Sequence, residues 1–439
     1  MDRTKRYTRL LKEETALAVG CTEPIAIALA CAKARETLLG EAAGVPDPDR
    51  IELALSRNII KNALGVGIPG TKMTGIPIAA ALGYAGGESS RGLEVISAVP
   101  PEKIEKAASF VERHLVSISQ YEGEENLYIQ ARVVLGDRSS SVVIRHTHTG
   151  IARIERDGKI LFEDFTDPEE AGTEPEISTR SLLDIYEFAR EAPLEPLKFL
   201  LEGARLNKLV ALEGLRGAYG LQVGRSIKAG VEKKILSESI TTYGVELASG
   251  ASDARMAGCN LPVLTNSGSG NQGITVSLPV VAAAEKMGLG EEELHRALVM
   301  SNLAAIHARK GLDRLTAMCG AFTAGIGASC GIVFLLGGGV ARVYRAVQNM
   351  VANLTGMVCD GAKDGCALKI ASVVEAAFRS ALLAMEDISI NGDKGINEKD
   401  VEKSLRNLVR IGNTGMDDTD RIILDIMVSK DPAAPGPSA

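Results

Sequence analysis

Hydrophobic positions recur with two different spacings along the chain. Beyond residue 180 they follow the spacing of helices, in one long series. Between residues 51 and 155, shorter apolar runs alternate with polar residues and end at turn-forming pairs such as Gly136-Asp137 and Asp157-Gly158. The pattern therefore predicts a largely helical chain with a smaller group of strands in its first half.

The predicted elements group into two domains. Helices are expected at residues 4–18, 25–39, 182–189, 194–219, 245–257, 276–287, 291–310, 331–351, 367–385 and 398–411. Strands are expected at residues 51–55, 116–120, 127–135, 140–147 and 151–155, with helices at 76–84 and 101–114 between them. We expect an α+β fold in which a helical catalytic domain, residues 1–44 and 166–430, carries an inserted α+β domain, residues 45–165. Residues 167–179 have the composition of a linker, and we expect residues 431–439 to form a disordered tail.

One apolar segment is long enough to suggest a membrane span. No charged residue occurs between Arg314 and Arg342. The segment is, however, interrupted by Gly320, Gly325, Gly327, Gly331 and Gly337 to Gly339, and it carries two cysteines. Buried central helices with close backbone contacts explain it better than a span, so we expect no membrane partner.

Charge and cysteine content narrow the class of function. The 439 residues carry a net charge of −7 and no long basic run, which argues against nucleic acid as a partner. Seven cysteines in a chain whose first residues contain no apolar signal core favour a cytoplasmic protein with reduced thiols. Such thiols are available as metal ligands or nucleophiles, and small-molecule chemistry is the expected function.

Three cysteines have a spacing that permits a shared metal centre. Cys359 and Cys366 lie close together in a Gly/Asp-rich turn, and Cys319 lies forty residues before the first of them. A zinc ribbon would need two short cysteine pairs, whereas iron–sulfur clusters accept ligands from distant loops. The same spacing also suits three unrelated buried thiols.

A fourth cysteine lies at a predicted helix start. In Gly20-Cys21-Thr22-Glu23-Pro24, the threonine is the predicted N-cap, and the glutamate and the proline suit the first helical turn. Unpaired amides and the helix dipole stabilise a thiolate, so we expect a lowered pKa for Cys21. Cys31, in the middle of the following helix, is expected to be a core residue.

Two further stretches could bind ligands. Residues 264–273 combine glycines with small polar side chains before a helix, as in loops that hold a carboxylate or a phosphate. His146 and His148 close a predicted strand and would point to the same face of it. A solvent-facing pair is the simpler interpretation, and His146 facing a cleft between the domains is the other.

Together these motifs resemble the L-cysteine desulfidases, a family related to the alpha chain of iron–sulfur L-serine dehydratases. The resemblance is carried by Gly20-Cys21-Thr22-Glu23-Pro24, residues 58–71, His146-Thr147-His148, residues 265–273, Cys319-Gly320 and residues 359–366. It spans residues 5 to about 420. Two departures from the serine dehydratases favour the desulfidases: a shorter interval between the last two cysteines, and Leu264 to Gly268 where they have Pro-Thr-Asn-Gly.

The resemblance implies an oxygen-labile [4Fe-4S] cluster whose unique iron binds the substrate thiolate. Its ligands would be Cys319, Cys359 and Cys366. Cys21 would be the base that removes the Cα proton, or a displaceable fourth ligand. The substrate-binding residues would be Glu23, Asn58, Lys61, Asn62, Thr71, His146, Asn266, Ser267, Gly268, Ser269, Asn271 and Gln272.

The implied function is a lyase that cleaves L-cysteine to pyruvate, ammonia and hydrogen sulfide. Two other functions stay open: dehydration of L-serine on the same scaffold, and a cluster-binding cysteine sensor without turnover. An amino acid is the expected small-molecule partner, and a homodimer is the candidate assembly.

Overall fold

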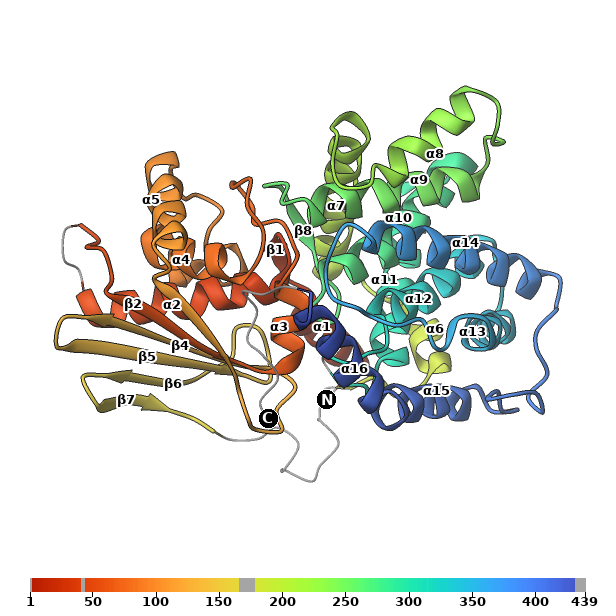
Figure 1. The fold of residues 1–439 in the computed structure, drawn as a ribbon. Helices are drawn as coiled ribbons and strands as arrows, with labels where there is room; N and C mark the ends of the chain where they lie inside the picture. Colours follow the sequence, from red (N-terminus) through yellow and green to blue (C-terminus); the bar gives the residue numbers. More distant parts are fainter. Residues whose placement is uncertain (1, 41–43, 166–177, 314, 431–439) are drawn as a thin grey trace.

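The computed structural model describes residues 2–40, 44–165, 178–313 and 315–430. Its two parts lie side by side, a sheet covered by helices and a larger bundle of helices (Figure 1). The fold is therefore α+β, as predicted. Most of the predicted linker, residues 167–179, and all of the predicted tail, residues 431–439, lie outside the described residues.

The sheet has six strands in the order β3-β2-β4-β5-β6-β7. β2 and β3 are parallel, and the other neighbours are antiparallel. Its strands are β2 (Arg50–Leu55), β3 (Val116–Gln120), β4 (Tyr128–Leu135), β5 (Arg138–Arg145), β6 (Ile151–Arg156) and β7 (Lys159–Glu163). In β2, the alternate residues Ile51, Leu53 and Leu55 are buried, which is the pattern of a sheet covered on one face.

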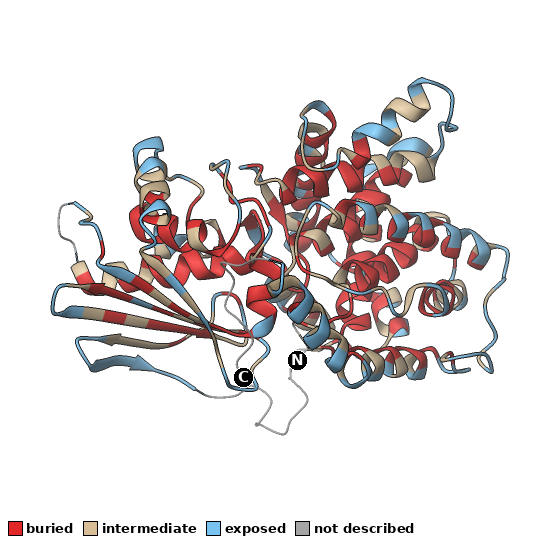
Figure 2. Ribbon diagram, in the orientation of Figure 1, coloured by how far each residue is buried: buried red, intermediate tan, exposed pale blue. Residues whose placement is uncertain are grey.

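Helices cover that face of the sheet. They are α2 (Thr22–Leu39), α3 (Arg57–Ala63), α4 (Ile76–Gly86) and α5 (Pro101–Glu112), with a short 3₁₀ helix η1 (Ser89–Glu94). The opposite face and the edge strand β7 are largely exposed (Figure 2).

The helix α2 packs with the sheet and not with the helical bundle. Its apolar side chains, including Ile25, Ile27 and Leu29, share one buried cluster with Ile51 and Leu53 of β2. The predicted division groups residues 1–44 with the helical domain, and of these α1 (Arg3–Glu14) packs there, through Tyr7, Leu10 and Leu11. α2 is apolar around most of its circumference, so its sequence pattern does not indicate which neighbour covers it. The domain division stays a prediction.

The bundle surrounds α12, which is buried along nearly its whole length. Its helices are α6 (Leu182–Glu191), α7 (Lys198–Arg216), α8 (Val223–Glu232), α9 (Ile240–Met256), α10 (Gly270–Met287), α11 (Glu291–Ala308), α12 (Gly320–Leu335), α13 (Val340–Leu354), α14 (Cys366–Met385) and α15 (Val401–Arg410). Short turns η2 (Glu195–Leu197) and η3 (Ile411–Gly415) complete it. None of the helices in the described part of the chain is long and apolar enough to cross a membrane.

The single helix predicted at residues 331–351 is wrong. The structure has two helices there, because α12 ends at Leu335 and α13 begins at Val340. Between them, Gly337 has a φ of 75°, a backbone conformation that favours glycine. The chain therefore turns within the uncharged segment.

Two contacts between helices or strands help to join the parts. The strand β1 (Leu17–Val19) pairs antiparallel with β8 (Pro262–Leu264), with Ala18 opposite Val263. The last helix, α16 (Asp417–Val428), lies across the front of the molecule beside α3 (Figure 1). These contacts place the start of α2 next to the bundle.

Candidate functional site

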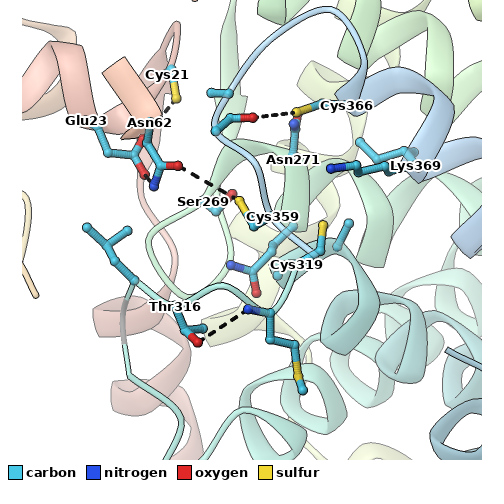
Figure 3. Close-up of a pocket in the computed structure, with 18 of the residues that line it drawn as sticks. Cys21, Glu23, Asn62, Ser269, Asn271, Thr316, Cys319, Cys359, Cys366 and Lys369 are labelled. Atoms are coloured by element: carbon cyan, nitrogen blue, oxygen red, sulfur yellow. Dashed lines mark hydrogen bonds between the residues drawn. The ribbon is translucent and has the colours of Figure 1, made fainter. Parts of the chain in front are cut away.

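A cavity of about 100 Å³ lies where the two parts meet, and Cys21, Cys319, Cys359 and Cys366 all line it (Figure 3). The sheet part contributes Cys21, Glu23 and Asn62, and the bundle contributes the rest. The structure therefore brings together four of the seven cysteines.

Four helices begin at this cavity. Cys21 is the N-cap residue of α2, Ser269 that of α10 and Cys319 that of α12, and Cys366 is the first residue of α14. None of the four N-cap residues uses its side chain to cap the helix. Four positive dipole ends thus meet in one place, although the first amides of α14 already bond the carbonyls of Lys363 and Asp364. Such a cavity favours anions.

Backbone pairing brings Cys319 and Cys359 together. The amide of Cys319 donates to the carbonyl of Met357 at 2.9 Å, and the amide of Cys359 donates to the carbonyl of Ala317 at 2.6 Å. Cys366 follows after a turn in which its amide bonds the carbonyl of Lys363 at 2.9 Å. The long interval that separates these cysteines in sequence is thus closed by a bridge between two loops.

The three cysteines are partly exposed as whole residues, and two of them have raised pKa values. Burial, and then the proximity of Cys359 and Cys366, raises the pKa of Cys319 to about 12. Burial likewise raises the pKa of Cys366 to about 11. Thiols with such values stay protonated at neutral pH unless a metal takes the place of the proton.

The described residues contain no preformed site for a single metal ion. Among them, no group of three or more His, Cys, Asp or Glu side chains is arranged to hold one ion. A cluster that contains its own sulfides spaces its cysteine ligands more widely than one ion does. Cysteine thiolates are the ligands that hold iron–sulfur clusters, and Cys319, Cys359 and Cys366 line this cavity.

Cys21 has a raised pKa, and the predicted lowering is wrong. Its Sγ donates to Glu23 Oε2 at 2.9 Å. Burial and then the negative charge of Glu23 raise the pKa of Cys21 well above its usual value, against the opposing effect of Arg255. Cys21 lies at a helix start, as predicted, although the N-cap residue is Cys21 and not Thr22. Burial beside a carboxylate outweighs the helix dipole.

The carboxylate of Glu23 is held in a network. Asn62 Nδ2 donates to its Oε1 at 3.2 Å, and Thr22 Oγ1 donates to its Oε2 at 3.1 Å. His148 Nε2 lies 3.9 Å from Oε1. Burial alone would raise the pKa of Glu23, but His148, the hydrogen bond from Cys21 and Arg255 lower it on balance. Glu23 is therefore an ionised group behind Cys21.

The loop before α10, together with the first turn of that helix, has a supporting half and a half that lines the cavity. Ser269, Asn271 and Gln272 line the cavity. Asn266, Ser267 and Gly268 do not appear in its lining. Asn266 Nδ2 bonds Asn302 Oδ1 at 3.0 Å, Ser267 Oγ bonds Asn266 Oδ1 at 3.0 Å, and Gly268 has a φ of 78°. This half fixes the turn that presents Ser269.

Four other predicted substrate-binding residues lie outside the cavity lining. The Nζ of Lys61 pairs with Asp420 of α16, and Asn58 lies in a separate hollow beside α16. Thr71 Oγ1 bonds the carbonyl of Ile68 at 2.9 Å within its own turn. His146 lies beyond the end of β5 with a φ of 62°. Because β5 ends at Arg145, the two histidines do not share a strand face, and His148 is the one that approaches Glu23.

Three cations outside the sequence motifs line the cavity, namely Arg255, Arg309 and Lys369. Arg255 lies at the end of α9 with only 3% of its surface exposed. Lys369 lies one turn after Cys366, and its Nζ donates to the carbonyl of Val358 at 2.9 Å and pairs with Asp360. The available signal for Arg255 was a cation among the small residues that end α9, at positions 248–258.

Comparison with known proteins agrees with the motifs. Residues 90–425 match the model of the serine dehydratase alpha chain. A UPF0597 protein of Oleidesulfovibrio alaskensis is 48% identical over 97% of this chain and 98% of its own length. UPF0597 proteins of Bacteroides thetaiotaomicron and Clostridium perfringens are 45% and 41% identical, each over 97% of this chain and 98% of their own lengths. The chain belongs to the serine dehydratase alpha-chain family.

Proposed function

We propose that the chain is an iron–sulfur-dependent lyase that cleaves L-cysteine to pyruvate, ammonia and hydrogen sulfide in this cavity. The observation that carries the proposal is the meeting of Cys319, Cys359 and Cys366 at the starts of α12 and α14, beside Cys21 at the start of α2. Membership of the serine dehydratase alpha-chain family supports a lyase.

The cofactor would be a [4Fe-4S] cluster held by Cys319, Cys359 and Cys366. When bound, it supplies a Lewis-acidic iron that stabilises the sulfur leaving the substrate. The helix starts at Cys319 and Cys366, together with Lys369, offset the negative charge of three thiolates. Cys359 has a further polar neighbour, since Asn62 Oδ1 lies 3.9 Å from its Sγ.

Proton removal from Cα would fall to Cys21 together with Glu23. The Cα proton would pass to the Cys21 sulfur while the thiol proton moves to Glu23 Oε2, the atom it already faces at 2.9 Å. The electron pair of the Cα–H bond forms the Cα–Cβ double bond, and the Cβ–S bond breaks. The resulting aminoacrylate tautomerises and takes up water to give pyruvate and ammonia without further protein groups.

The substrate carboxylate would face the start of α10. Ser269, Asn271 and Gln272 line the cavity there, and the uncapped first turn offers backbone amides. The apolar side chains of Leu315, Met318 and Ile370 also line the cavity, together with the hydroxyl of Thr316. Apolar contacts of this kind accommodate a thiol at Cβ at a lower desolvation cost than a hydroxyl.

L-serine dehydration is the second candidate, and the family description favours it. The two are separated by incubating anaerobically reconstituted protein with each amino acid and measuring pyruvate and sulfide. We expect equal amounts of pyruvate and sulfide from L-cysteine, at a rate well above that of pyruvate from L-serine. A faster reaction with serine would favour the dehydratase, and iron-loaded protein that turns over neither would indicate a cysteine sensor.

The Cys21→Ala variant tests the role of Cys21. We expect it to bind as much iron as the wild-type protein and to lose pyruvate formation by about 10²- to 10⁴-fold, the usual contribution of a general base. Iron content and pyruvate formation are measured on the same preparation, with Cys31→Ala as the control because Cys31 is buried in α2. Loss of iron in Cys21→Ala would instead make Cys21 a cluster ligand.

A further inference from the structure

Arg255 is a buried cation in an unusual place. It is 3% exposed and lines the cavity, and its Nε has no hydrogen-bond partner among the described residues. A Cβ atom at Gly270 would overlap the Nε of Arg255, so the guanidinium lies directly against the first residue of α10.

The position of the Arg255 guanidinium is electrostatically unfavourable unless an anion binds beside it. The start of a helix carries a positive partial charge, so a cation beside it is repelled. An unpaired buried charge also loses its hydration without compensation. Glu23 and Cys21 influence Arg255 through space, but no ion pair joins Arg255 to either of them. An anion placed between the guanidinium and the first amides of α10 would offset both costs.

We propose that Arg255 binds the α-carboxylate of the amino-acid substrate. A guanidinium can donate two parallel hydrogen bonds to a carboxylate, and the first turn of α10 supplies further donors on the other side. The assignment rests on the proposed function for the identity of the substrate. It makes Arg255 the residue that selects amino acids over the corresponding amines and amides.

Glycine at position 270 follows from the same arrangement. A side chain there would displace the guanidinium from the start of α10. The loop residues Asn266 to Gly268, which lie outside the cavity lining, hold this close approach in place. Carboxylate binding thus depends on both α9 and α10.

Binding of L-alanine and L-alaninamide tests the proposal without turnover. Both carry the ammonium group and lack a leaving group at Cβ, and they differ in the charge of the carboxyl end. With anaerobically reconstituted protein, calorimetry should show that wild type binds alanine roughly 10- to 100-fold more tightly than the amide, as for hydrogen bonds to a charged group. In Arg255→Gln this ratio should fall to about one, and Arg255→Lys should retain part of it.

Arg225→Gln is the matched control, because Arg225 is exposed on α8, and it should keep the wild-type ratio. A wild-type ratio in Arg255→Gln, or no preference for alanine in the wild-type protein, would overturn the assignment. Iron content should be equal in wild type and Arg255→Gln, and a loss of iron would show that Arg255 serves the thiolates instead. If the protein released no sulfide from cysteine but kept the ratio, the proposed function would fail and the carboxylate site would stand.

Discussion

At the scale of residues, the environment of Cys21 decides its chemistry. The sequence predicted the helix start at Cys21 correctly, but the pKa of the thiol depends on groups that are distant in the chain. Asn62 and His148 belong to other elements and fix Glu23 beside Cys21. Local sequence rules describe the helix dipole, whereas burial and charge come from the tertiary fold.

The Glu23→Gln substitution should lower the pKa of Cys21. Burial remains in this variant, but the negative charge that also raises the pKa is removed. The thiolate of Cys21 should therefore form at lower pH than in the wild-type protein. Alkylation of Cys21 in iron-free protein, followed by peptide mass spectrometry over a pH series, measures this.

Cys31 and Cys330 provide internal standards in the same digest, since both are fully buried. Their alkylation should not change between wild type and Glu23→Gln. An unchanged or higher inflection pH for Cys21 in the variant would contradict the role given to Glu23.

Arg255 illustrates why the sequence could not predict the whole site. The three metal-ligand candidates and Cys21 were recognisable from their motifs, and the structure gathers them in one cavity. Arg255 belongs to no such motif. Its role depends on the start of α10, which lies against its guanidinium in the folded chain. Lys61 shows the converse. It belongs to one of the recognised motifs, but it pairs with Asp420 and does not line the cavity.

At the scale of elements, the link from β8 to α10 positions the substrate loop. The sequence predicted this helix from residue 276, but α10 begins at Gly270. Residues 270–273 include two glycines and an asparagine, which are weak helix formers, so propensity placed the start too late. Packing of Gly273 against the carbonyl of Leu264 holds the first turn in place.

Gly273→Ala should therefore destabilise the protein and weaken substrate binding. A Cβ at this position would overlap the Leu264 carbonyl oxygen, so α10 must move away from β8. We expect a loss of about 1–3 kcal/mol in the free energy of unfolding, as for other overpacked sites, and a raised KM. Denaturant unfolding and steady-state kinetics measure the two effects.

Gly339→Ala is the control, because Gly339 lies at the start of α13 and nothing lies within 4 Å of a Cβ placed there. Its stability and KM should equal those of the wild-type protein. A Gly273→Ala variant with wild-type KM would show that the start of α10 does not position the substrate.

At the scale of the whole molecule, the cavity depends on how the sheet part and the bundle are joined. β1 pairs with β8 on one side, and α16 packs against α3 on another. The sequence predicted both parts but neither joint, because β1 and β8 are three residues long and α16 follows a π-helical turn. Such short or irregular elements carry too little periodicity to be read from sequence.

Asp420→Asn should loosen the joint between α16 and α3. The side chain of Lys61 is 1% exposed and pairs with Asp420, so the substitution leaves a buried charge without its partner. Breaking such a pair typically costs about 3–5 kcal/mol in the free energy of unfolding. Hydrogen exchange should also become faster at the amides of α16.

Asp418→Asn is the control, because it removes a nearby carboxylate that is 81% exposed. It should change neither the free energy of unfolding nor the hydrogen exchange of α16. If the α16 amides of Asp420→Asn exchanged hydrogen as slowly as in the wild-type protein, and the free energy of unfolding were unchanged, the ion pair would not hold the two parts together.

The central claim is that Cys319, Cys359 and Cys366 hold one cluster at the joint between the two parts. Iron content after anaerobic reconstitution tests it most directly, in the wild-type protein, in each single Cys→Ala variant and in the Cys330→Ala control. We predict about four iron atoms per chain for wild type and the control, and a severe loss in all three ligand variants. Equal iron content in any of the three variants, or no iron in the wild-type protein, would contradict the account.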